Sequence, residues 1–210
     1  MAAEIKETEN VQKVYDKIAS HFDKTRFAVW PVVEKFMSDL PNNTIGYDAG
    51  CGNGKYMKLR EDTYILGADN SIELLKICHK KALNVIYMNL FEQTIRNSSV
   101  DYIICIAVLH HLSNSERRLE VLRQFYEGLK QNGKVLIFVW AKEQPKFENS
   151  DTQDIMVPWH TNENGTMVTY KRYYHVFVKG ELEDLVKNAG FSITNSGCDK
   201  GNWYVEGHKL

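Results

Sequence analysis

The sequence predicts an α/β domain built on a doubly wound, mostly parallel β-sheet with an antiparallel C-terminal strand. Strand-like and helix-like segments alternate along most of its 210 residues, and the segment VDYIICIAV at 100–108 is almost entirely apolar. This alternation favours a parallel sheet, whose strands are apolar because helices cover both of its faces. We therefore interpret residues 1–210 as one enlarged domain.

Two helices are expected before the sheet begins. Apolar residues recur at helical spacing from Val11 to Phe22, and Pro31 is a favoured first-turn residue that begins a second helix. Between them, the connector HFDKTRFAVW at 21–30 holds aromatic side chains and an arginine. We interpret residues 1–42 as an N-terminal helical cap.

The core is predicted at residues 43–140, where a strand, a glycine-rich turn, a helix and a second strand follow one another. Ser113 and Glu116 form a potential capping box, which predicts a helix that continues to Lys130. The strands are expected at 44–50, 63–69, 84–88, 100–108 and 134–140, with a further helix at 71–82.

The region 141–169 differs from the core, because it is polar, holds two of the four prolines and shows no sustained periodicity. We interpret it as a long functional loop and assign 141–175 to an insertion that carries substrate contacts. Residues 176–210 are then expected to supply a short helix and a strand pair around the turn Asp199-Lys200-Gly201-Asn202.

The composition limits the possible partners and locations. The 26 Lys and Arg residues balance 27 Asp and Glu residues, so no chain-wide basic surface indicates nucleic acid. The four cysteines stand singly and predict structural thiols rather than a metal site. The longest apolar run, at 103–109, is too short to cross a membrane. We expect an intracellular protein, in the cytoplasm with the nucleus as a second location.

The residues with the clearest chemistry are Asp48-Ala49-Gly50-Cys51-Gly52-Asn53-Gly54, between a predicted strand and a predicted helix. Glycines let a ligand approach the backbone, and Asp48 would welcome an ammonium group. Asp69 ends the next strand, where a carboxylate can accept from both ribose hydroxyls. Together these features suit S-adenosylmethionine. Two plainer interpretations stay open: a simple tight turn, and an Asp69 that caps the helix after Ser71.

At this point the chain resembles a known family. DAGCGNGKY at 48–56 and GADNS at 67–71 look like motif I and the following acid of class I S-adenosylmethionine-dependent methyltransferases. Further motifs resemble the eukaryotic tRNA wobble-uridine carboxymethyl methyltransferases: HFDKTRFAVWP at 21–31, IAVLHHLS at 106–113, VWAKEQ at 139–144, QDIMVPW at 153–159, RYYHVF at 172–177 and NWYV at 202–205.

The resemblance implies methyl esterification of 5-carboxymethyluridine at the tRNA wobble position. It also implies a small zinc-binding activator subunit that pairs with an exposed sheet edge. The cofactor contacts implied are Tyr15, Asp48, Gly50, Cys51, Gly52, Asn53, Gly54, Asp69, Asn70, Asn89, Leu90 and Ala107. One departure concerns Asn89, which stands where the family usually has Asp and offers a weaker acceptor to the adenine amino group.

A carboxylate nucleophile is already ionised near neutral pH, so the reaction needs no general base but needs donors that hold the carboxylate in line. The candidates for this task are Arg26, His110, His111, Trp140, Arg172, Tyr173 and His175. Of the two adjacent histidines, one is expected to face the site and the other to pack. Tyr15 and Trp30 could instead belong to the core, and at most one of Trp203 and Tyr204 can line the site.

Two other functions remain open on the sequence alone. A class I methyltransferase of a small molecule or a protein would share the glycine-rich turn, but it would not account for the RYYH and VPW motifs. A non-catalytic subunit could keep the fold and lose cofactor affinity through Asn89.

Overall fold

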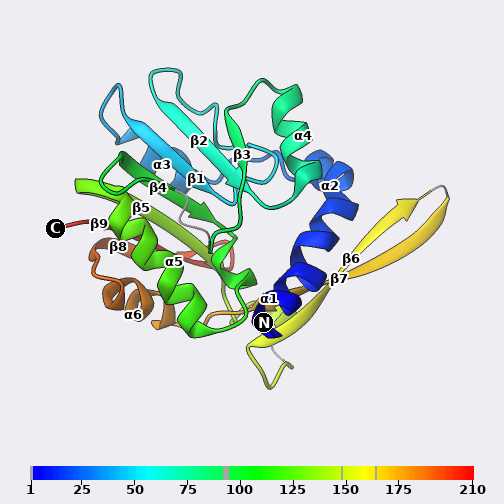
Figure 1. Ribbon diagram of the computed structural model, residues 1–210. Coiled ribbons are helices and arrows are strands. Elements are labelled where there is room, and N and C mark those ends of the chain that lie inside the picture. The colour runs from blue at the N-terminus through cyan, green and yellow to red at the C-terminus, as the bar shows by residue number, and fades with distance from the viewer. Residues whose placement is uncertain (1, 92–94, 148, 164) are drawn as a thin grey trace.

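A seven-stranded sheet forms the centre of the protein in a computed structural model that describes residues 2–91, 95–147, 149–163 and 165–210. Its strand order is β3-β2-β1-β4-β5-β9-β8 (Figure 1), in which β3, β2, β1, β4 and β5 are mutually parallel and β9 is antiparallel to both of its neighbours, β5 and β8. The predicted doubly wound sheet is confirmed. The strands are β1 (Ile45–Ala49), β2 (Tyr64–Asp69), β3 (Val85–Tyr87), β4 (Val100–Ile106), β5 (Leu129–Trp140), β8 (Ser192–Asp199) and β9 (Asn202–His208).

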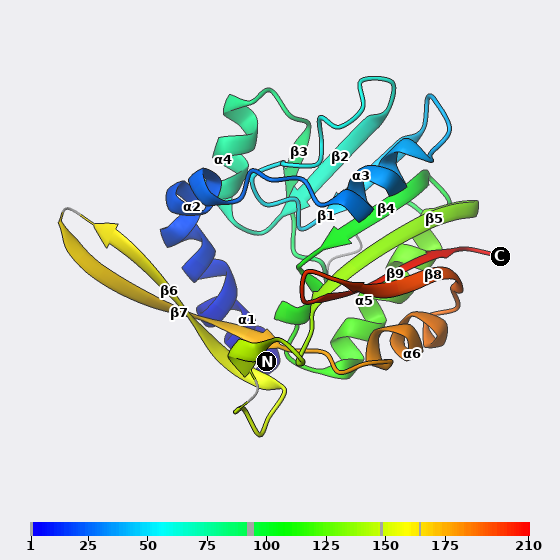
Figure 2. The ribbon, with the colours of Figure 1, turned by 180° about the vertical axis from the view of Figure 1, so that it is seen from behind.

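Helices cover both faces of this sheet. Phe125 and Val186 represent α5 and α6 in the larger apolar core, whereas Phe36 and Leu75 represent α3 and α4 in the core on the other face. Figure 1 shows α5 and α6 in front of the sheet, and Figure 2, the view from the opposite side, shows α3 in front of it. The helices are α1 (Ala2–Glu7), α2 (Lys13–Thr25), α3 (Pro31–Ser38), α4 (Ile72–Lys80), α5 (Ser115–Gly128) and α6 (Glu181–Asn188), with a π-helical turn η1 (Thr8–Gln12) and 3₁₀ turns η2 (Leu109–His111) and η3 (Pro145–Phe147).

The topology places a ligand crevice where the chain reverses its direction across the sheet. β1 is flanked by β2 on one side and β4 on the other, so the connections after these strands diverge. Crevices at such switch points, at the carboxyl ends of parallel strands, are the usual ligand sites of open α/β sheets. The glycine-rich turn after β1 lies at this point.

The polar region after the core is not a loop, which corrects the interpretation of 141–169. Strands β6 (Asp154–Glu163) and β7 (Thr166–His175) pair into an antiparallel hairpin that projects beside α2 in both ribbon views (Figures 1 and 2). Trp159 packs against Val14 and Ile18 of α2. The other hairpin face bears exposed residues, and Pro158 is tolerated because a two-stranded sheet consists only of edges. Packing on α2, which periodicity does not report, fixes this hairpin.

Three local boundaries also differ from the sequence prediction. Asn114, not Ser113, caps α5 by accepting from the Arg117 backbone N–H, while Ser113 donates to Glu7. Helix α5 ends at Gly128, so that β5 begins earlier than predicted. Residues 52–58 form successive turns rather than a regular helix.

Candidate active site

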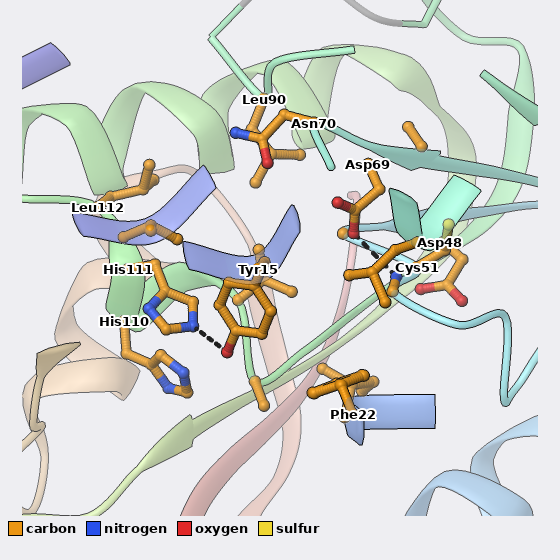
Figure 3. Close-up of a pocket in the computed structure, with 18 of the residues that line it drawn as sticks. Tyr15, Phe22, Asp48, Cys51, Asp69, Asn70, Leu90, His110, His111 and Leu112 are labelled. Atoms are coloured by element: carbon orange, nitrogen blue, oxygen red, sulfur yellow. Dashed lines mark hydrogen bonds between the residues drawn. The ribbon is translucent and has the colours of Figure 1, made fainter. Parts of the chain in front are cut away.

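A pocket opens at the carboxyl ends of β1, β2, β4 and β5 and is roofed by the N-terminal helices (Figure 3). Its lining contains most of the residues singled out from the sequence: Tyr15, Arg26, Asp48, Gly50, Cys51, Gly52, Asn53, Asp69, Asn70, Asn89, Leu90, Ala107, His110, His111, Trp140 and Arg172. Trp30 lines it as well, whereas Trp203 and Tyr204 do not. Residues from distant parts of the sequence therefore meet in one cavity.

The glycine-rich turn comes directly after β1 and lies against the neighbouring strand β2. The backbone N–H groups of Gly50 and Cys51 both donate to the carbonyl of Ala68, at 2.8 and 3.0 Å. Gly50 has φ +75°, and a Cβ there would lie 2.4 Å from Val108. Gly54 does not line the pocket: a Cβ there would meet Leu83 at 2.1 Å, so this glycine serves packing rather than direct ligand contact.

Asp48 is a buried carboxyl at the pocket wall. It is 1% exposed, and its Oδ2 has no hydrogen-bond partner within the described residues. Burial, together with the neighbouring charge of Asp69, raises the pKa of Asp48 to about 8, against an opposing effect of Lys55. A solitary buried carboxyl of this kind gains greatly from a cationic ligand. The ammonium group of S-adenosylmethionine fits this position.

Lys55 is the basic group closest in sequence to this turn, and it also lines the pocket. Burial and the neighbouring Arg26 lower the pKa of Lys55 to about 8, while Asp48 raises it. Its ammonium lies over the rings of Trp30 and Tyr56. A ligand carboxylate beside the ammonium would find its counter-charge here, so the donor set matches an amino-acid end.

Asp69 faces the same cavity from the end of β2. Its carboxylate accepts from the backbone N–H of Gly52 at 2.9 Å and of Ser71 at 2.8 Å. Burial raises the pKa of Asp69, although these backbone hydrogen bonds oppose the effect. The cap of α4 is Ser71, whose Oγ accepts from Leu74 N–H, so the interpretation of Asp69 as the helix cap is wrong.

The expected adenine end is lined by Asn70, Met88, Asn89 and Leu90. The side-chain oxygen of Asn89 accepts from the backbone N–H of Phe91 at 3.1 Å. An amide oxygen has two lone pairs, so a second hydrogen bond from an amino group is compatible with this contact. Asn89 thus keeps an acceptor at this end of the pocket, without the charge of a carboxylate.

The two histidines of η2 have opposite tautomers. Nδ1 of His110 accepts from the backbone N–H of Trp140 at 3.1 Å, which leaves its hydrogen on Nε2. Nδ1 of His111 lies 2.8 Å from the carbonyl oxygen of Tyr173 and must donate, so Nε2 accepts from the Tyr15 hydroxyl at 3.0 Å (Figure 3). Both rings line the pocket, in contrast to the expectation that one would pack.

Burial keeps both rings neutral. It lowers the pKa of His111 to about 3, against the opposing hydrogen bond to Tyr173. Burial also lowers the pKa of His110 well below the ordinary value, and neighbouring His111 and Arg172 add to this effect. The pair therefore offers the cavity a neutral N–H donor from His110, and His111 anchors Tyr15.

Arg172 brings a buried positive charge to the opposite wall. It is 4% exposed, and no carboxylate in the described chain forms an ion pair with it. Its Nη1 donates to the Tyr15 hydroxyl at 3.2 Å, and its Cζ lies 4.6 Å from the Trp159 ring centroid. Its Nε has no hydrogen-bond partner among the described residues. Such a guanidinium is suited to an anionic ligand.

An aromatic surface borders this charge. Trp140 and Tyr174 stack with ring centroids 4.2 Å apart and an interplanar angle of 17°. Tyr174 lines the pocket, while Tyr173 does not, because successive side chains of β7 point to opposite faces. The prediction that Tyr173 lies in the site is therefore wrong, and its neighbour Tyr174 takes that position. His175 shares the outer face with Tyr173 and also lies outside the pocket.

The lining residues that sequence reasoning missed include Lys55, Phe22 and Tyr174. Strand alternation about Arg172 would have selected Tyr174 over Tyr173. Lys55 directly follows the last glycine of the turn, where its side chain can reach back into the cavity. Phe22 carried no such signal, since its spacing is that of an ordinary core residue.

Comparison with known proteins bears on this pocket. A family model described as "Methyltransferase domain" matches residues 47–137. The tRNA (carboxymethyluridine(34)-5-O)-methyltransferase of Schizosaccharomyces pombe is 41% identical to this chain, over 97% of each protein. The chain belongs to this methyltransferase family. The Saccharomyces cerevisiae protein of the same name is 30% identical, again over 97% of both chains, and the Xenopus tropicalis protein alkbh8 is 32% identical over all of this chain and 42% of its own length.

Solved methyltransferase structures share the fold. An S-adenosylmethionine-dependent methyltransferase from Methanosarcina mazei superposes with a TM-score of 0.71 at 16% identity, covering 87% of this chain and 98% of its own. A chain from the complex between the Haloferax volcanii Trm112 methyltransferase activator and the putative methyltransferase gives a TM-score of 0.71 at 13% identity, covering 94% and 96%. This chain therefore has the fold of the solved methyltransferases, as expected from its sequence.

Among the described residues, no helix is both long and apolar enough to cross a membrane. No group of three or more His, Cys, Asp or Glu side chains in that part of the chain could hold a metal ion.

Proposed function

We propose that this enzyme transfers a methyl group from S-adenosylmethionine to the carboxylate of 5-carboxymethyluridine at the tRNA wobble position, which yields the methyl ester. The observation that carries the proposal is the buried Arg172, which faces the pocket without an ion-pair partner among the described residues. Asp48 and Asp69 supply a cation-binding and hydroxyl-binding end, and Arg172 supplies an anion-binding end. One cavity thus fits a sulfonium cofactor and an acidic substrate.

When bound, the cofactor supplies an electrophilic methyl group, and the protein supplies placement. The substrate carboxylate is ionised near neutral pH, and the neutral His110 and His111 are not required as bases. Arg172 and the Nε2–H of His110 can donate to carboxylate oxygens. Trp140 and Tyr174 provide an apolar wall that excludes water. Because transfer removes the carboxylate charge, these donors serve orientation, a factor that contributes roughly 7–11 kcal/mol in favourable systems.

Tyr15 links His111 and Arg172 through hydrogen bonds to its hydroxyl. Its hydroxyl donates to His111 Nε2 and accepts from Arg172 Nη1, so the Tyr174 hydroxyl, 3.3 Å away, must be the donor in their contact. The network fixes α2 against β7 above the cavity. In this assignment Tyr15 is part of the substrate clamp, and it need not act solely as a cofactor lid.

We also propose that a small zinc-binding activator subunit adds a strand at the free edge of β3. This edge is apolar, since Tyr87 at its end is 54% exposed and Ile72 on the neighbouring α4 is 50% exposed. The other edge, β8, bears mainly polar exposed residues, such as Thr194 and Asn195. The balanced net charge of −1 further suggests that a partner supplies part of the grip on tRNA. The four free cysteines suit a reducing compartment, the cytoplasm or nucleus.

Nucleoside mass spectrometry of tRNA from a deletion strain tests the proposal. We expect loss of the methyl ester and accumulation of the carboxymethyl nucleoside. The wild-type gene should reverse this change, and an Asp69→Ala allele should not. An unchanged nucleoside profile would leave methylation of a small molecule or a protein as the better explanation. Absence of S-adenosylmethionine binding in calorimetry, with the activator present, would instead indicate a non-catalytic subunit.

A further inference from the structure

A second group of ionisable side chains lies at the base of the β6–β7 hairpin, outside the pocket. His175, which ends β7, is 9% exposed. Its Nδ1 lies 2.8 Å from Oδ1 of Asp154, and its Nε2 lies 2.7 Å from Oε1 of Glu181. Asp154 begins β6 and Glu181 begins α6, so one imidazole joins both hairpin strands to the body of the protein.

The geometry specifies the charge of this ring. A neutral imidazole has a single N–H and can donate to only one of the two carboxylates, so both contacts are hydrogen bonds only for the imidazolium. Burial raises the pKa of Asp154 and of Glu181, but the hydrogen bonds and charge of His175 act against it, together with hydrogen bonds from Tyr173 to Asp154 and from Gln153 and the Val178 backbone to Glu181, so that the pKa of each carboxyl lies below its ordinary value. Asp154 and Glu181 are therefore the charged partners that face the ring.

The surrounding groups complete the cluster. The Tyr173 hydroxyl donates to Asp154 at 2.7 Å, and Gln153 Nε2 donates to Glu181 at 2.6 Å. The ammonium of Lys6 lies 3.7 Å from the Tyr173 ring centroid, and Arg118, buried beside the cluster, adds a further positive charge. Two carboxylates thus face His175, with Lys6 and Arg118 as the additional cations nearby.

The alternation of β7 connects this cluster with the pocket. Tyr173 and His175 point to the cluster, whereas Arg172 and Tyr174 point to the cavity. The hairpin forms a two-stranded sheet of its own, separate from the main sheet, so its base fixes how β7 is rotated. A change at the cluster would move the guanidinium of Arg172.

We propose that His175 is a positioning residue, whose imidazolium bridges Asp154 and Glu181 and thereby aims Arg172 and Tyr174 at the substrate. The proposal rests on the proposed function only in its kinetic readout. Loss of the ring would leave the carboxylates of Asp154, whose side chain is half exposed, and Glu181 facing each other without their cation, and their repulsion displaces the strand that carries Asp154.

The kinetic test compares His175→Ala with His79→Ala, an exposed histidine on α4, in complex with the activator. For His175→Ala we expect kcat for tRNA methylation to fall roughly tenfold or more, with the Kd for S-adenosylmethionine changed by less than about twofold. Addition of Glu181→Gln should restore part of kcat, because it removes the like-charge opposition. Wild-type kinetics, or a parallel loss of cofactor binding, would overturn the proposal.

Two measurements keep the test independent of turnover. Nitrogen-15 NMR of the wild-type protein, at the assay pH, should show His175 protonated on both nitrogens; a neutral tautomer refutes the bridge. A crystal structure of His175→Ala should show Arg172 displaced from the cavity, and an unmoved Arg172 refutes positioning. If the wild-type enzyme fails to methylate tRNA, the proposed function fails, while these two measurements still decide the role of His175.

Discussion

The hydroxyl of Tyr15 lies 3.0 Å from Nε2 of His111, and this contact joins α2 to η2, the 3₁₀ turn after β4. The same hydroxyl accepts from Arg172, so three segments distant in sequence are fixed around one oxygen atom. An enzyme that positions rather than activates its nucleophile depends on such contacts. The roof and the substrate clamp should therefore respond together to changes at Tyr15.

Replacement of Tyr15 by Phe tests this coupling. The variant loses the donor to His111 and the acceptor for Arg172, and keeps the ring that packs near Phe22. We expect a loss of about 1 kcal/mol in stability, or roughly 2–4 °C in Tm for a chain of this size, with kcat/KM for tRNA lowered about tenfold. Thermal unfolding and steady-state kinetics measure both. Tyr170→Phe is the matched control, because the Tyr170 hydroxyl contacts the exposed Glu163, and it should leave kcat/KM unchanged.

Arg172→Ala separates substrate placement from cofactor binding. Since Arg172 lies at the anion-binding end, its loss should leave the Kd for S-adenosylmethionine unchanged and slow methyl transfer by about 10²-fold or more. Arg172→Lys should recover little, because an ammonium cannot reproduce the planar, bidentate guanidinium. Calorimetry and single-turnover assays give the two quantities. The adjacent, exposed Lys171→Ala provides the control, and full turnover by Arg172→Ala would refute the clamp.

Asp69→Ala should abolish measurable cofactor binding in calorimetry. Asp69 is the carboxylate at the end of β2, and its oxygens accept from the backbone N–H groups of Gly52 and Ser71. Its removal thus eliminates the ribose acceptor and loosens the glycine-rich turn. Asp39→Ala, which breaks an exposed ion pair with Lys35, should bind the cofactor normally. Retained affinity in Asp69→Ala would contradict the assignment.

The meeting of Asp48 and Asp69 in one pocket was predictable from the sequence for a physical reason. Carboxyl ends of parallel strands meet at one edge, so Asp48 and Asp69 had to lie together once the strands were recognised. The substrate half depends on the hairpin, which the sequence did not reveal. Its strand pattern contains Pro158, and its burial comes from Trp159 docking on α2, a tertiary contact. Without the hairpin, strand alternation could not separate Tyr174 from Tyr173.

The same limit applies to helix ends and to hydrogen-bond direction. Ser113 fits a capping box, but the arrival of Glu7 from α1 engages its hydroxyl and backbone N–H and leaves the cap to Asn114. The tautomers of His110 and His111 follow from the backbone groups of Trp140 and Tyr173. Such partners are set by long-range packing, whereas residue types alone indicate only that donors are present.

The pH dependence of cofactor affinity should report Asp48. In the empty protein its pKa is raised to about 8, mainly by burial, so below pH 8 an ammonium-bearing ligand must displace a proton. Affinity should therefore rise with pH up to about 8 and fall above it, where Lys55, whose pKa is lowered to about 8, loses the charge that meets the ligand carboxylate. Calorimetry in buffers of different ionisation enthalpy should detect release of close to one proton at pH 7. Asp48→Asn should bind more weakly at pH 8 and should lack the rise in affinity below that pH.

Stability should follow the opposite course in the absence of cofactor. Because the folded-state pKa of Asp48 lies above its ordinary value of 3.8, the folded protein binds this proton more tightly than the unfolded chain does. The stabilisation is complete below pH 3.8 and is lost as pH rises to about 8, with each tenfold difference in proton affinity amounting to about 1.4 kcal/mol. Asp48→Asn should accordingly raise the free energy of unfolding of the empty protein at pH 8, as measured by urea denaturation. Equal stability of variant and wild type at that pH would show that Asp48 is solvated in solution, and the predicted proton release on binding would then be absent as well.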